Sequence, residues 1–170
     1  MARHIALLRA VNVGGTGVLA MSDLARICRD AGFARVATHL ASGNVVFDDP
    51  RDAAQVKTEL ETRLSAFVGK PLGVFLRSAA EMRAVLEANP FPDKPPNLSV
   101  AIFLDAPPPV DALERCSGGV DEILRLGLRE IHVHYPAGIG RSKLKIPAAK
   151  LGTARNMNTI AKLVAMTREA

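Results

Sequence analysis

The basic side chains near the C-terminal end are the residues whose type and spacing most clearly suggest chemistry. Between Ile131 and Arg168 the sequence contains seven Lys and Arg residues and not one Asp or Glu. The chain as a whole has 22 basic and 17 acidic residues, so the rest of the sequence carries a net charge of −2. A negatively charged partner should therefore meet this last quarter of the chain, whereas the alternative interpretation is a solvated basic face.

Within this segment, two motifs predict an anion site. The first is the loop motif Arg141-Ser142-Lys143, and the second begins with Thr153 and contains Arg155, Asn156 and Asn158. If Thr153 caps the final helix, Arg155 and Asn156 lie in its first turn, where unpaired backbone N–H groups and the helix dipole already favour an anion. A cation there is destabilising unless an anion binds, and the alternative is that Arg155 extends into solvent.

Two polar turns in the first half are further candidates. Asn12 precedes Gly14 and Gly15 at the exit of the first expected strand, and Ser42-Gly43-Asn44 forms a tight turn between two others. Glycine permits a close approach of the backbone to a ligand, and an irregular turn without a ligand is the alternative. These turns could line the same cleft as the basic loop.

Cofactor and metal sites are not expected. Residues 15–20 match the loose G-x-G-x-x-A pattern, but the helix begins several residues later and no acidic residue follows at the spacing that binds a ribose, so we expect no nicotinamide or flavin. His132 and His134 share one face of a predicted strand without a third ligand nearby, so we expect no metal. Cys28 and Cys116 stand far apart without a C-x-x-C motif, which favours a reducing cytoplasm.

The elements that must position these residues follow from hydrophobic periodicity. In the first half, the pattern predicts strand, helix, strand, strand, helix, strand, which is the split βαβ order of ferredoxin-like α+β domains. The expected strands are 4–11, 36–40, 44–47 and 72–76, with helices at 22–31, capped by Ser22, and from Asp49 to Gly69.

The second half is predicted to repeat this theme. A helix at 78–87 and a proline-rich stretch at 89–97 connect to expected strands at 98–104, 122–126 and 130–135. A short helix around Leu113 and a long final helix over 154–167 complete the order. The fold class is thus predicted as α+β, with two ferredoxin-like subdomains packed together at 1–77 and 98–170 and a linker at 78–97.

Composition limits the class of protein. The 170 residues are 48% hydrophobic and 23% charged, which is enough apolar material for a core. The mean hydropathy is only +0.14, and no apolar run approaches the length of a membrane span. We expect a cytoplasmic protein without a signal peptide or a membrane partner. The sequence does not predict the oligomeric state.

The spaced motifs together resemble a bacterial family of uncharacterised cytoplasmic proteins, domain-of-unknown-function family 1697. The motifs are Leu8–Gly15 with Met21 and Leu24, Ser42–Phe47, Arg141–Leu144, and Thr153–Asn156 with Asn158 and Thr159. The resemblance implies an α+β fold with ferredoxin-like parts and no established activity. It also supports one polar constellation, in which Met157 stands where the family usually has an aromatic residue. The members are Arg9, Asn12, Ser42, Asn44, Arg141, Ser142, Lys143, Arg155, Asn156 and Asn158.

The function hypothesis is a site for a phosphate-bearing ligand, a nucleotide or a nucleic-acid backbone, in a cleft between the subdomains. Arg141, Lys143 and Arg155 would supply charge, while the Asn side chains would orient the ligand. The expected first strand has no aromatic residue, so stacking of single-stranded bases is not expected. One alternative is an enzyme acting on a phosphorylated small molecule. Another is a structural clamp made of the same Arg and Asn residues.

Overall fold

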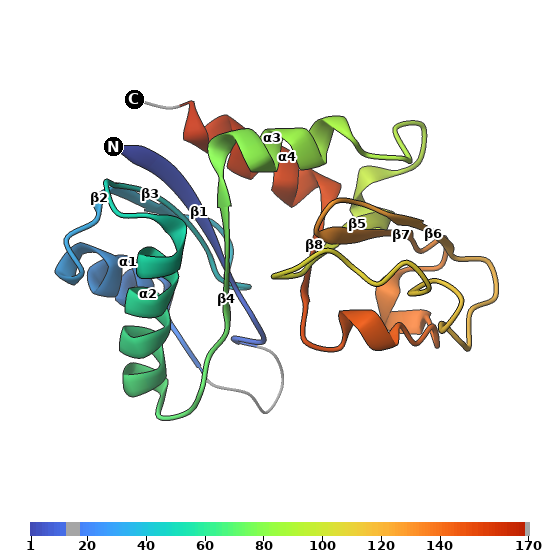
Figure 1. The fold of residues 1–170 in the computed structure, drawn as a ribbon, viewed down its shortest axis with the longest axis horizontal. Helices are drawn as coiled ribbons and strands as arrows, with labels where there is room; N and C mark the ends of the chain where they lie inside the picture. The colour runs from blue at the N-terminus through green and yellow to red at the C-terminus, as the bar shows by residue number, and fades with distance from the viewer. Residues whose placement is uncertain (13–17, 169–170) are drawn as a thin grey trace. The chain divides into compact units, whose positions relative to one another are not determined.

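The computed structural model describes residues 1–12 and 18–168 and divides the chain into two compact units (Figure 1). The first unit comprises Met1–Arg83 with Leu163–Ala170, and the second comprises Ala84–Lys162. This division differs from the predicted boundaries, because the second unit starts inside the connecting helix and the last residues of the chain group with the first unit. Among the described residues, the fold is mixed α/β, with two four-stranded antiparallel sheets and four α-helices.

The first unit contains the predicted order of strands and helices. Its elements are β1 (Ala2–Leu8), α1 (Met21–Asp30), β2 (Ala34–Thr38), β3 (Asn44–Asp49), α2 (Ala53–Val68) and β4 (Val74–Ser78), followed by α3 (Ala79–Glu87). The sheet has the order β2-β3-β1-β4, and every neighbouring pair of strands is antiparallel. Each strand end is therefore placed by both local sequence and pairing across the sheet.

The core of the first unit lies between one face of this sheet and helices α1 and α2 (Figure 1). Alternate strand residues such as Ala6, Val45 and Leu76 point to the same face, because side chains in a strand alternate. They pack against the helical stripes that contain Cys28 and Leu60. Cys28 is fully buried, as expected for a core residue, and burial raises the pKa of its thiol to about 12.

Two predicted helix starts in the first unit were wrong. Helix α1 begins at Met21 after Ala20, which makes no side-chain cap, so Ser22 is not the cap residue. Helix α2 is capped by Asp52, whose side chain accepts the Gln55 N–H while the Gln55 side chain accepts the Asp52 N–H. This reciprocal capping box stabilises a helix start more effectively than a single polar residue upstream.

The second unit has four strands and the first part of a long helix, whose residues from Leu163 on group with the first unit. The elements are β5 (Ser99–Phe103), β6 (Ile123–Leu126), β7 (Glu130–His134), β8 (Thr153–Asn156) and α4 (Met157–Thr167), with short 3-10 turns at Pro96–Leu98, Ile139–Arg141 and Pro147–Ala149. The sheet order is β6-β7-β5-β8. One face is apolar and packs residues such as Val100, Ile131 and Tyr135.

The predicted element order of the second unit was wrong at two places. Residues 110–115 form turns where a short helix around Leu113 was expected. Residues 153–156 form strand β8 where the final helix was expected to begin. Pairing of β8 with β5 explains the second difference, because Arg155 lies opposite Ala101 and Thr153 lies opposite Phe103. This pairing partner is about fifty residues away in sequence and leaves no local signal.

Candidate functional site

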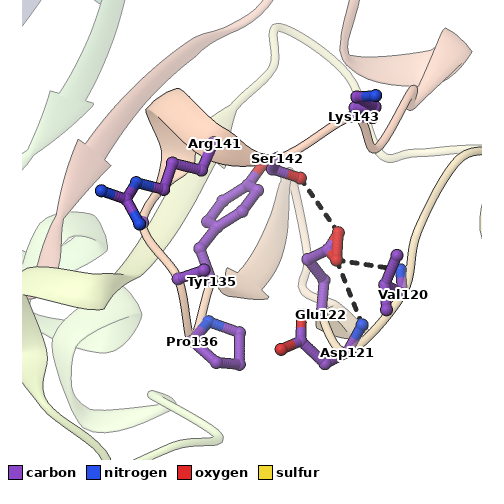
Figure 2. A pocket seen from close by; sticks show the side chains of 10 residues that line it. Val120, Asp121, Glu122, Tyr135, Pro136, Arg141, Ser142 and Lys143 are labelled. Carbon is purple, nitrogen blue, oxygen red and sulfur yellow. Dashed lines mark hydrogen bonds between the residues drawn. The ribbon is translucent and has the colours of Figure 1, made fainter.

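A pocket in the second unit gathers part of the predicted basic motif. Its volume is about 360 Å³. Three segments line it: residues 120–122 before β6, residues 135–138 after β7, and residues 141–143 at and after the 3-10 turn (Figure 2). All three segments belong to the same unit.

Glu122 joins two walls of this pocket. Its carboxylate accepts hydrogen bonds from the Ser142 hydroxyl at 2.9 Å, from the Val120 N–H at 3.0 Å and from the Asp121 N–H at 3.2 Å (Figure 2). The Val120 N–H, followed by the Ser142 hydroxyl, holds the pKa of Glu122 below its ordinary value despite partial desolvation. Glu122 is therefore ionised at neutral pH and fixes Ser142 in place.

A second set of contacts fixes the same two segments. Ser117 and Lys145 form an isolated antiparallel bridge, in which the Ser117 N–H donates at 3.1 Å and the Lys145 N–H donates at 2.7 Å. Gly118 has φ +76°, and a Cβ on it would overlap the Lys143 carbonyl. Only glycine allows this close approach, so the pocket walls are preformed by the backbone.

Tyr135 supplies an aromatic surface to the pocket. Only 6% of the residue is exposed, and its ring lies among Arg141, Ser142 and Glu122 in Figure 2. Burial, and then the nearby Glu122 carboxylate, raise the pKa of the Tyr135 phenol. The phenol is therefore neutral and is a potential hydrogen-bond donor to a ligand.

The charged groups of the pocket that face solvent are not paired with one another. Arg141, Lys143 and Asp121 are exposed, and within the described part of the chain none of their side chains forms an ion pair or hydrogen bond. Figure 2 shows Arg141 on the Tyr135 side of Ser142 and Lys143 on the other side. The pocket thus presents two available cations and one available carboxylate.

Sequence reasoning found one side of this pocket and missed the other. Arg141, Ser142 and Lys143 were predicted, and they line it. Asp121 and Glu122 were not predicted, because the charge pattern singles out only the acid-free segment after Ile131. A usable signal was present in the two adjacent acidic residues one position after the Gly118-Gly119 pair, where a turn is expected before a strand.

The predicted site residues of the first unit hold its own loops. The Asn12 amide donates to the carbonyls of Leu19 and Ala41 at 2.7 Å each, and its oxygen accepts the Leu19 N–H at 2.7 Å. The fully buried Asn44 donates to the His39 carbonyl at 2.6 Å and to the Ser42 hydroxyl at 3.1 Å. Both amides therefore have structural partners.

The other predicted site residues of the first unit are Arg9 and the glycines that follow the first strand. Arg9 is half-buried after β1, and its backbone N–H donates to the Gly73 carbonyl at 3.0 Å. Gly14 and Gly15, and residues 15–17 of the glycine-rich motif at 15–20, lie outside the described residues.

The predicted helix-end site at Thr153 was wrong in its geometry. Arg155 lies on β8, is only 6% exposed, and donates to the Thr153 hydroxyl at 2.8 Å and the Ala154 carbonyl at 2.9 Å. The helix cap is Asn156, whose side-chain oxygen accepts the Thr159 N–H at 2.9 Å. Asn158 is exposed on the first turn of α4. Because a cap must immediately precede the helix, Thr153 is too early to serve.

The structure describes each unit by itself. Convergence of Arg9, Asn12 and Asn44 with Arg141 and Arg155 in one cleft therefore stays a prediction.

The described residues contain neither a metal-binding cluster of acidic, His or Cys side chains nor a membrane-spanning helix. No group of three or more His, Cys, Asp or Glu side chains there could hold a metal ion. Within the same residues, no helix combines the length and apolar character needed to span a bilayer.

The comparisons with known proteins agree with this architecture, a mixed α/β protein with two four-stranded sheets. The family DUF1697, described as a protein of unknown function, matches residues 1–132. The chain belongs to this family. The match ends before residues 135–143 of the pocket.

One solved structure is similar over nearly the whole chain. It is that of the conserved bacterial protein SP0830 from Streptococcus pneumoniae, with a TM-score of 0.79 and 25% sequence identity. The similarity covers 98% of this chain and 99% of that one. No curated protein matches the sequence.

Proposed function

We propose that the second unit binds a small phosphate-bearing molecule in the pocket lined by residues 120–122, 135–138 and 141–143. The observation that carries this proposal is the pair of exposed cations, Arg141 and Lys143, placed on one preformed cavity without a carboxylate partner. A guanidinium can hold two phosphate oxygens at once, and a lysine ammonium adds a point charge. The cavity of about 360 Å³ is within the size range of small-molecule sites.

A small molecule is favoured over a nucleic-acid backbone by the charges of the pocket. Glu122 and Asp121 contribute carboxylates next to the two cations. A polyanion bound along this surface would be attracted by the two cations but repelled by the two carboxylates. A small ligand can place its phosphate next to Arg141 alone.

An enzymatic role is less well supported. Glu122 and Ser142 are hydrogen bonded, as a base and a nucleophile would be, but the lowered pKa of Glu122 makes it a weak base. The Ser142 hydroxyl also accepts the Leu144 N–H at 3.1 Å. These bonds stabilise the loop, so we assign Glu122 and Ser142 to the pocket wall.

Isothermal titration of the full chain with phosphorylated metabolites tests the proposal. Arg141→Gln should weaken binding about tenfold or more, because a charged hydrogen bond is lost. Lys145→Gln is the matched control: it removes an exposed charge from the same loop, but Lys145 does not line the pocket. Equal affinity in the wild type and Arg141→Gln would contradict the proposal.

The salt dependence of binding distinguishes the two ligand classes. A small phosphate compound should lose little affinity between 50 and 200 mM salt, whereas a polynucleotide backbone loses on the order of a thousandfold when six or more phosphates are contacted. A steep loss for single- or double-stranded nucleic acid, with no binding of small phosphates, would favour the nucleic-acid alternative.

The order β2-β3-β1-β4 of the first unit supports the prediction of a ferredoxin-like arrangement for that unit. The second sheet, β6-β7-β5-β8, has the same strand order, but within these described residues no α-helix lies between β5 and β6 or between β7 and β8, so this proposal extends to the first unit only.

A further inference from the structure

The Asp121 carboxylate is an available hydrogen-bond acceptor at the pocket. Its residue is exposed, and its side chain makes no ion pair or hydrogen bond with any residue that the structure describes. Its backbone is held, because the Asp121 N–H donates to the Glu122 carboxylate. A carboxylate without a partner, on a backbone that is held in place, suits a ligand that brings hydroxyl groups, as a ribose does.

The same pocket has an apolar side. Pro136 and Ala137 line this side, whereas Val120, which is 93% exposed, lies on the other side of Asp121 and Glu122 (Figure 2). In Figure 2, Pro136 lies beside Tyr135, and the Asp121 carboxylate is turned toward the Pro136 side. Contact with a flat apolar ligand group would remove this surface from water.

Resting on the proposed function above, we propose that the ligand is a nucleoside phosphate. Its phosphate binds Arg141, its ribose hydroxyls donate to Asp121, and its base covers Pro136 and Ala137. Arg141 and Asp121 carry opposite charges on one pocket but form no ion pair, which leaves room for a ligand between them. Inorganic phosphate or a sugar phosphate would leave the apolar side uncovered.

The affinities of the full chain for a series of ligands test the contributions of the phosphate, the ribose and the base separately. The probes are inorganic phosphate, ribose 5-phosphate, the four common ribonucleoside 5′-monophosphates and the corresponding nucleosides. At least one nucleoside monophosphate should bind about tenfold more tightly than ribose 5-phosphate, since the base adds apolar contact. Nucleosides should bind weakly, and their affinity should not depend on Arg141→Gln.

The role of Asp121 is tested by combining a variant with a ligand change. Asp121→Ala should weaken binding of the ribonucleotide about tenfold, and removing both ribose hydroxyls from the ligand should have the same effect on the wild type. The two changes together should cost no more than either alone, because each removes the same hydrogen bonds. Asp93→Ala is the control, since Asp93 is an exposed acid of the same unit that does not line the pocket.

The outcomes separate this inference from the proposed function. If ribose 5-phosphate binds as tightly as every nucleotide and depends on Arg141, the nucleoside assignment is wrong and the phosphate site stands. If the effects of Asp121→Ala and of hydroxyl removal are simply additive, Asp121 does not bind the ribose and the inference fails. If no phosphate compound binds, or none depends on Arg141, both proposals are overturned.

Discussion

Replacement of Arg155 tests whether this buried cation is a structural element or a charge that awaits an anion. Burial lowers the pKa of Arg155 to about 10 from 12.5, so the group remains charged at neutral pH. A shift of that size corresponds to a cost of about 3 kcal/mol for burying the charge. Hydrogen bonds of the guanidinium, which include those to the Thr153 hydroxyl and the Ala154 carbonyl, offset this cost in the folded state.

Because these hydrogen bonds oppose the cost of burying the charge, we expect the buried side-chain stem to dominate the result. Arg155→Ala removes the buried methylene groups and should lower the free energy of unfolding by about 2 kcal/mol. Arg155→Met keeps an apolar stem of similar length while removing the charge, so it should lie within about 1 kcal/mol of the wild type. Thermal melts should place the Ala variant about 4 to 8 °C below the wild type.

The opposite order of stabilities would refute this reasoning. If Arg155→Ala melts at or above the wild-type temperature without added anion, Arg155 is a repelled cation. Phosphate or a nucleotide should then raise the melting temperature of the wild type but not of the variant. Urea unfolding with an unchanged m-value excludes an effect on the unfolded state.

Three further predictions concern backbone packing, loop structure and thiol reactivity. Gly118→Ala should destabilise the protein more than Gly138→Ala in urea unfolding and should abolish ligand binding, because both glycines have positive φ but only Gly118 packs against a carbonyl. Asn12→Ala should cost about 1 to 3 kcal/mol in the same assay through three lost hydrogen bonds; an unchanged midpoint would contradict its structural role. With an aromatic disulfide reagent at neutral pH, Cys116 should react before Cys28, whose thiol is buried and has a pKa of about 12; equal rates would show that the core opens readily.

Much of the first unit could be predicted because its signals are local. Short continuous apolar runs define β1 and β3, and Gly69, with φ +79°, ends α2 as expected. The prediction failed at helix starts, where several polar residues in a row could serve as the cap. Only the positions of Asp52 and Gln55 relative to the first turn decide which one does.

The candidate site was predicted only on its basic side. Arg141 and Lys143 stand out because no acidic residue lies near them in sequence, and that pattern is a sequence property. Asp121 and Glu122 are about twenty residues away, and they reach the same pocket through the Ser142 hydrogen bond and the Ser117 to Lys145 bridge. Contacts of this kind depend on the fold.

The sequence by itself determined that the fold combines helices and strands, and it determined the core stripes and the basic C-terminal segment, because each follows from the order and spacing of residue types along the chain. Only the tertiary structure decided that Thr153–Asn156 is a strand, since its partner β5 is distant in sequence and supplies the hydrogen bonds that a helix would otherwise make internally. Tertiary structure also decided that Arg155 is buried and hydrogen bonded while Arg141 and Lys143 are exposed at a pocket. All three are cations in one acid-free segment, and burial, which depends on what the fold packs around each side chain, is the property that separates them.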